Sequence, residues 1–185
     1  MDDELTEHLL LSDARKSIIS NALECASELF EQQGLKFSLV TDEERVPEIR
    51  AQFQELLFDK KEYLAAAASL MQISAFFNLP MYADEAKKVS ASLYQFADES
   101  YYADGRFNDA RRLFMLAAGL QHDNRKVLEA MVEACLQQVE SEIAEKGEQE
   151  ESHPLLQMAL PYAQLLSQLD SGYSRLDYVQ GLIDK

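Results

Sequence analysis

The sequence predicts an all-α protein built from consecutive antiparallel helix hairpins. Apolar residues recur every three or four positions along most of the 185-residue chain, which is the spacing that places them on one face of a helix. Helix breakers are scarce, with 6 Gly and 4 Pro, and most of them lie between the periodic segments. Small and aromatic residues also recur at offsets that let two antiparallel helices pack closely.

The first predicted helix runs from Ser12 to Gly34, since Ser12 can cap its start and Gly34 its end. The segment Leu35 to Val46 alternates briefly like a strand but has no second strand nearby with which to pair. We therefore expect an ordered loop there, with one helical turn after Thr41. Residues 1–46 form the N-terminal helix and its connection.

Six further helical segments follow and alternate in direction, because short turns join them. Pro47 suits the first position of a helix, Asn78 to Pro80 should end one, and Asn124 can cap another. Pro161 predicts a kink, or a break after Ala159 or Leu160. The expected helices within residues 47–170 are Pro47–Phe58, Tyr63–Phe77, Tyr82–Ala103, Asn108–Leu120, Arg125–Lys146 and Pro154–Leu169.

The polar, acidic run from Lys146 to Ser152 has no apolar period and predicts a solvated loop or a frayed helix end. Ser171 and Gly172 break the chain again. Residues 171–185 then predict a short amphipathic helix that covers the open end of the helix stack.

One segment carries a recognisable repeat pattern. Its residues are Tyr94, Ala97, Asp98, Tyr101, Gly105, Phe107, Ala110, Phe114, Ala117 and Leu120. This segment resembles the tetratricopeptide repeat (TPR) family, although Ala97 and Asp98 replace the usual Leu-Gly pair and His122 replaces the closing Pro. The resemblance implies a TPR-like α-solenoid and a binding module.

Gly105 is taken as position 15 of the repeat, which fixes where neighbouring repeats should begin. On this numbering the chain has about three repeats, which begin near Pro47, Ala91 and Arg125. The aromatic residues Tyr63 and Phe107 occupy equivalent positions but are 44 residues apart, against a repeat of about 34. Extra residues around 79–88 therefore lengthen this junction. The helix from Ser12 to Gly34 is either a degenerate fourth half or an N-terminal cap, and a non-repeating helix bundle remains the alternative fold.

Composition narrows the classes of partner. The chain has 33 acidic and 17 basic residues and a net charge of -16, so its field repels nucleic acid and anionic membrane surfaces. Cys25 and Cys135 lie far apart in the sequence, outside any CxxC pair, which predicts buried thiols in a reducing compartment. The acidic N-terminus does not resemble a signal peptide. We expect a cytoplasmic protein that binds neither nucleic acid nor membranes.

No pattern points to chemistry. The three histidines, His8, His122 and His153, lie in separate segments without HxxxH or HExxH spacing. No phosphate-binding glycine loop and no GxSxG nucleophile motif occurs. The sequence therefore predicts a non-enzymatic protein without a metal site, cofactor or catalytic residue.

The TPR resemblance implies that certain positions of each first helix line an inner, concave face. Position 9 of the repeat is acidic in all three repeats: Glu55, Glu99 and Glu133. Position 12 is large and apolar: Phe58, Tyr102 and Leu136. Residues three apart share one side of a helix, so these positions would form an acidic and apolar stripe. The predicted partner-binding residues are Glu55, Phe58, Gln95, Glu99, Tyr102, Glu133 and Leu136. Such a stripe favours a protein or peptide with basic residues beside apolar anchors. The alternative is an ordinary solvated helix face.

The function expected from this pattern is protein binding. The acidic inner face, with Ala51 and Glu129 among its residues, speaks against a TPR clamp for a C-terminal carboxylate. In size, acidity and repeat number the chain resembles the TPR-type chaperones of bacterial type III secretion, over Pro47 to Gln137 and in architecture only. A fixed scaffold subunit of a larger complex is the alternative, homodimerisation stays open, and nothing supports an all-α enzyme.

Overall fold

The computed structural model describes the backbone of residues 2–147 and 154–184, with side chains from residue 13 onward. These ranges contain helices and connecting loops, and no β-strand occurs within them. The expected all-α class is confirmed.

The helical elements follow the sequence pattern closely. In chain order they are α1 (Asp2–Gln32), η1 (Glu43–Arg45), α2 (Val46–Gln54), η2 (Glu55–Asp59), α3 (Tyr63–Met71), α4 (Ser74–Phe77), η3 (Pro80–Tyr82), α5 (Ala83–Phe96), η4 (Ala97–Tyr102), α6 (Phe107–Leu120), α7 (Arg125–Lys146), α8 (Pro154–Leu169) and α9 (Arg175–Ile183). Elements η2 and η4 are π-helical turns that continue α2 and α5.

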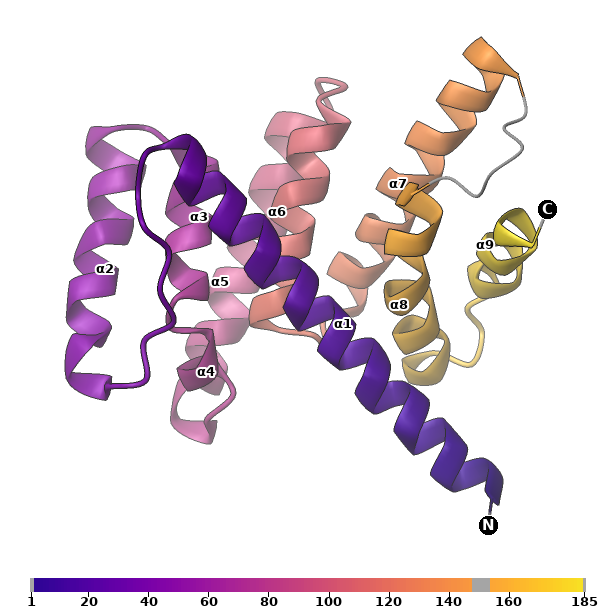
Figure 1. The fold of residues 1–185 in the computed structure, drawn as a ribbon, viewed down its shortest axis with the longest axis horizontal. Coiled ribbons are helices and arrows are strands. Elements are labelled where there is room, and N and C mark those ends of the chain that lie inside the picture. The colour runs from indigo at the N-terminus through magenta and orange to yellow at the C-terminus, as the bar shows by residue number, and fades with distance from the viewer. Residues whose placement is uncertain (1, 148–153, 185) are drawn as a thin grey trace.

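Three helix hairpins follow one another along the chain. Helix α2 pairs with α3, α5 with α6, and α7 with α8. Helix α3 also contacts α6, and α6 contacts α7, so each hairpin packs against the next (Figure 1). The short helix α9 packs on α8 at the C-terminal end.

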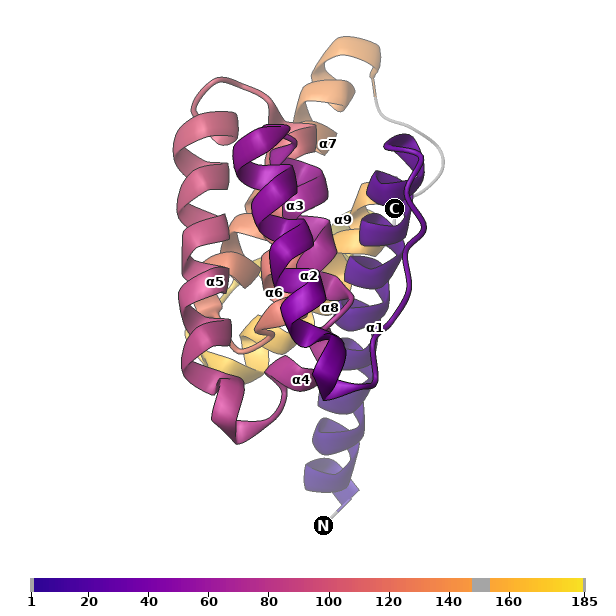
Figure 2. The same cartoon turned by 90° about the vertical axis from the view of Figure 1, so that its left-hand side faces the viewer.

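Helix α1 lies across all three hairpins and contacts α3, α6 and α8, the second helix of each (Figure 1). Figure 2 shows α5 on the side of the molecule away from α1. The expectation that α1 is a fourth half-repeat or an end cap is therefore wrong. Its apolar side, with Ile18, Ala22 and Phe30 fully buried, continues over several turns and covers the row of second helices.

The start of α1 also differs from the prediction. The helix begins at Asp2, so Ser12 lies within it and does not cap it. No Gly or Pro interrupts the chain before Gly34, and a Ser is tolerated inside a helix. Gly34 ends the helix as expected: its φ is +67°, and the amide of Leu35 donates to the carbonyl of Phe30 at 2.9 Å.

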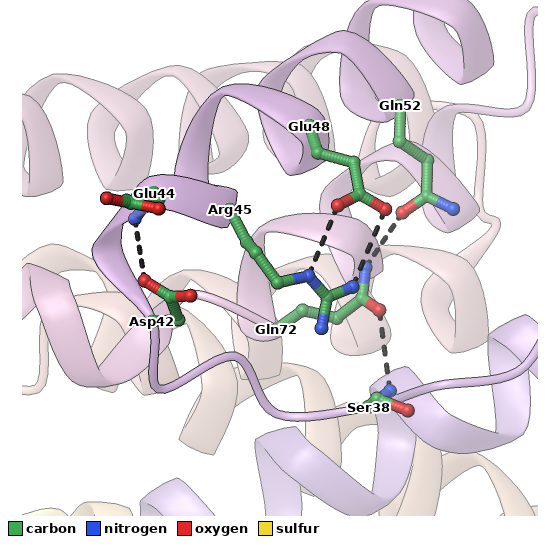
Figure 3. Close-up of polar contacts among 7 residues, drawn as sticks. All are labelled: Ser38, Asp42, Glu44, Arg45, Glu48, Gln52 and Gln72. Atoms are coloured by element: carbon green, nitrogen blue, oxygen red, sulfur yellow. Dashed lines mark hydrogen bonds and ion pairs between the residues drawn. The ribbon is translucent and has the colours of Figure 1, made fainter.

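The loop between α1 and α2 is ordered, as expected, and Gln72 attaches it to the first hairpin (Figure 3). Gln72 is 4% exposed. Its Nε2 donates to Oε1 of Gln52 at 2.8 Å, and its Oε1 accepts from the amide of Ser38 at 3.4 Å. Its backbone carbonyl accepts from the amide of Val40 at 2.8 Å. The turn expected after Thr41 is η1.

The helix predicted from Tyr63 to Phe77 is in fact two helices, α3 and α4, with a break at Gln72 and Ile73. The carbonyl of Gln72 bonds to Val40 in the loop. A carbonyl used by a distant amide favours an end to the helix at that point. Tertiary contact with the loop thus divides a segment whose local pattern is continuous.

Two further boundary predictions have clear outcomes. Asn124 caps α7, because its side chain accepts from the amide of Val127 at 3.4 Å, as expected. Of the kink or break predicted at Pro161, the break does not occur, since α8 continues past this residue to Leu169. Most of the acidic run from Lys146 to Ser152 lies outside the described residues.

Candidate functional site

A hollow of about 260 Å³ opens between the first helices of the second and third hairpins. Most of its lining comes from α5, η4 and α7, whereas α1 contacts the second helices. Its lining residues are Tyr94, Asp98, Tyr102, Phe114, Lys126, Glu129, Ala130 and Glu133.

Helical spacing explains how these side chains meet. Tyr94, Asp98 and Tyr102 follow one another at intervals of four along α5 and η4, so they share one side of that helix. On α7, Lys126, Glu129 and Glu133 likewise recur every three or four residues. Two facing helix sides thus form the walls.

The floor of the hollow is aromatic. Phe114 of α6 is 1% exposed, and its ring centroid lies 5.8 Å from that of Tyr94 and 6.4 Å from that of Tyr102. Tyr102 also packs edge-on against Phe107 at 5.1 Å. These contacts hold both tyrosine rings in place beside the carboxylates of the walls.

Burial and the carboxylates of the hollow raise the pKa values of its two tyrosines. Burial raises the pKa of Tyr94, and the nearby Asp98 and Glu129 carboxylates raise it further. Burial also raises the pKa of Tyr102, with added contributions from Glu133 and Asp98. A phenol is harder to ionise beside negative charge, and these carboxylates line the hollow together with the two rings.

A second hollow, of about 500 Å³, adjoins the first along α7. The two share Lys126, Glu129 and Glu133. The second hollow is also lined by Arg125, Leu166, Asp170, Gly172, Tyr173, Ser174 and Arg175. We refer to the two hollows together as the α7 groove.

The chain's own C-terminal region lines one side of the second hollow. Arg175, the first residue of α9, forms an ion pair with Glu133, with 3.1 Å between Nε and Oε1. Arg125 donates to the carbonyl of Leu169 at 2.7 Å. Burial raises the pKa of Tyr173, with contributions from Glu133 and Glu129. Acidic and basic side chains balance in this part of the groove, in contrast to the first hollow.

Two of the predicted partner-binding residues, Tyr102 and Glu133, line the α7 groove. Gln95 and Glu99 are exposed beside it and bond to each other, with 3.1 Å between Nε2 and Oε1. Glu55 forms an ion pair with Lys60 at 3.0 Å on the first hairpin. Phe58 is 68% exposed and does not line this groove.

Leu136 requires a correction, because it is 1% exposed and cannot contact a partner. Helix α7 packs against both α6 and α8, so more of its circumference is buried than in a helix with a single neighbour. Position 12 of the third repeat frame therefore belongs to the core.

The predicted set missed Tyr94, Asp98 and Lys126 as lining residues. The groove lies between neighbouring first helices, so it is lined by the side of α5 that faces α7, one position away from Gln95 and Glu99. The spacing of four between Tyr94, Asp98 and Tyr102 was readable in the sequence. Only the packing of α5 beside α7 shows which side of α5 matters.

Comparison with protein-family models, with curated proteins and with solved structures finds no match for this chain. Within residues 2–147 and 154–184, no helix has the length and apolar character needed to cross a membrane. The same described residues contain no cluster of three or more His, Cys, Asp or Glu side chains suited to a metal ion.

Proposed function

We propose that this chain is a non-enzymatic protein-interaction module that holds a basic, amphipathic segment of a partner protein in the α7 groove. The observation that carries the proposal is the first hollow, where three carboxylates and one lysine surround an aromatic floor. Carboxylates attract basic side chains, and aromatic rings supply apolar area to bury.

The helix arrangement is consistent with a TPR-like module. Three consecutive hairpins pack in series, and such repeats use the face formed by their first helices to bind extended or helical segments. The net charge of -16 adds a long-range attraction for a basic partner. Within this class we propose a cytoplasmic chaperone of the kind that serves bacterial type III secretion.

A photo-crosslinking experiment tests the proposal. Benzoylphenylalanine replaces the exposed Gln95 beside the groove in one variant of the full chain, and the exposed Glu24 of α1 in a matched control. We expect a partner protein to cross-link through position 95 and not through position 24. Reversal of Glu55, Glu99 and Glu133 together to Lys should then weaken this cross-link and leave the helix content unchanged. Equal cross-linking at both positions would contradict the proposal.

A fixed scaffold subunit is the second candidate, and the exposed apolar side chains Phe58 and Met81 favour it. They are 68% and 75% exposed and neither lines the α7 groove. A permanent interface would bury side chains of this kind. Purification of the chain alone separates the two candidates. A chaperone is expected to stay soluble and exchange partners. A scaffold subunit without its partner should aggregate or have a low melting temperature.

A further inference from the structure

The three acidic residues that the repeat pattern places at position 9 all have partners within the chain. Glu55 pairs with Lys60 at 3.0 Å, Glu99 accepts from Gln95 at 3.1 Å, and Glu133 pairs with Arg175 at 3.1 Å. A cation of the partner has to share each of these carboxylates with, or displace, the group that it already contacts. Acidic side chains without such a contact are therefore better candidates for the main contact.

Asp98 and Glu129 differ from them. Both are exposed, and both line the first hollow, from η4 and from α7. Neither side chain forms an ion pair or a hydrogen bond within the described part of the chain. These two carboxylates lie on facing helices, with the aromatic floor between them. A cation in the hollow can therefore contact a carboxylate on each side.

The aromatic floor suits the rest of a basic side chain. Tyr94, Tyr102 and Phe114 line the hollow, and the electron-rich face of an aromatic ring attracts a cation. Arginine and lysine also carry apolar stems, which bury well against aromatic surface. The hollow thus matches the charged group and the stem of one side chain.

The chain itself provides a precedent one helical turn along α7. There, the guanidinium of Arg175 pairs with Glu133 at 3.1 Å and lies 5.5 Å from the ring centroid of Tyr178. A carboxylate of α7 and a tyrosine ring together hold this basic residue of α9. Glu129 and Tyr94 offer the same pair of groups in the first hollow.

We propose that the first hollow is a subsite for one arginine or lysine side chain of the partner segment, held between Asp98 and Glu129 over the rings of Tyr94 and Tyr102. This inference rests on the proposed function and adds the chemistry of its main contact. Lys126 at the hollow opposes the bound cation, and Glu133 is engaged by Arg175. Binding should therefore tighten when the charge of Lys126 is removed.

Small probes test the subsite on the full chain without knowledge of the partner. N-acetyl-arginine amide is titrated into ¹⁵N-labelled protein, with N-acetyl-citrulline amide as a neutral control of the same shape. We expect saturable NMR shifts at residues 94–102 and 126–133 with the arginine probe alone. Equal binding of the citrulline probe, or shifts confined to other regions, would overturn the subsite.

Matched variants assign the binding to the two carboxylates. Asp98→Asn with Glu129→Gln should weaken binding of the arginine probe by at least about tenfold, because both charge-assisted contacts to the cation are lost. Glu55→Gln with Glu99→Gln removes the same charge outside the hollow and should change binding little. Lys126→Gln should strengthen it. Equal weakening by the two double variants would show a general charge effect and contradict the subsite.

The crosslinking experiment separates the subsite from the proposed function. One outcome is that the partner cross-links through position 95 with equal yield in the parent and in the Asp98→Asn, Glu129→Gln variant. In that case the subsite is wrong and the proposed function stands. If the arginine probe binds the hollow but no protein cross-links there, the proposed function is wrong and the cation subsite is upheld.

Discussion

Ala22 of α1 and Gly119 of α6 mark the closest described approach of a glycine to a neighbouring helix. A Cβ placed on Gly119 would lie 2.2 Å from Cβ of Ala22 and 3.2 Å from Cε of Met71 on α3. Three helices therefore converge at one point, where any side chain larger than hydrogen forces them apart. This contact helps to hold α1 across the hairpins.

Gly119→Ala is expected to destabilise the protein by about 2 kcal/mol. The added methyl group would lie 2.2 Å from Cβ of the buried Ala22. The overpacking cost therefore lies near the upper end of its usual range, about 3 kcal/mol, and the gain in helix propensity, about 1 kcal/mol, offsets only part of it. Urea unfolding followed by circular dichroism measures the difference.

Gly181→Ala is the matched control for this substitution. Gly181 also lies within a helix, α9, but nothing stands within 4 Å of an added Cβ. This variant should be stabilised by about 0.5–1 kcal/mol, since only the propensity term acts. Stabilisation by both substitutions would mean that α1 does not approach α6 in the way described.

Gln72→Ala should destabilise the protein by about 1–3 kcal/mol, since it removes the buried amide that joins the loop to α2. Hydrogen exchange at the amide of Ser38 is expected to accelerate as well, because this amide donates to the Gln72 side chain. Gln54→Ala, at an exposed position of α2, serves as control. Similar stability losses in the two variants would contradict the role of Gln72.

Cys25 and Cys135 should react slowly with thiol reagents in the native protein. Burial raises the pKa of Cys25 to about 11 and that of Cys135 to about 12, and they are 7% and 0% exposed. Because the thiolate is the reactive form, we expect slow labelling at pH 8, Cys25 before Cys135, and rapid labelling of both in urea. The two cysteines should give two kinetic phases of labelling, and single Cys→Ala variants show which cysteine produces each phase. A fast native phase from Cys135 would refute its burial.

His122 should make the protein less stable as the pH falls below about 6.5, the ordinary pKa of histidine. Burial lowers the pKa of His122, Arg15 lowers it further, and Asp123 partly opposes the shift. The unfolded chain therefore binds a proton that the folded chain resists, and this loss of stability grows until the pH reaches the lowered pKa. Above pH 7.5 the effect is absent.

The free energy of unfolding at pH 7.5 and pH 5.5, compared between the parent and His122→Gln, isolates this contribution. The other histidines and the carboxylates titrate in both proteins, so their effects cancel in the difference. The parent should lose more stability than the variant. Equal losses would show that His122 is as easily protonated in the folded protein as in the unfolded chain.

Local sequence patterns predicted the helices well, and their errors have tertiary causes. Gly34 and Asn124 cap helices as expected, because capping depends on a few neighbouring residues. The predicted helix from Tyr63 to Phe77 divides at Gln72, because a loop more than thirty residues earlier bonds to its carbonyl. Leu136 is buried because α7 has neighbours on two sides, which a repeat frame does not reveal.

The sequence by itself determined that this protein is all-α, where most helices lie, and that its surface is strongly acidic, since these properties follow from periodicity, capping and composition. Only the tertiary structure decided that α1 crosses the second helices and that Tyr94 and Asp98, rather than Gln95 and Glu99, face α7. Periodicity says that a helix has an apolar side, but contacts between distant segments decide which neighbour that side meets.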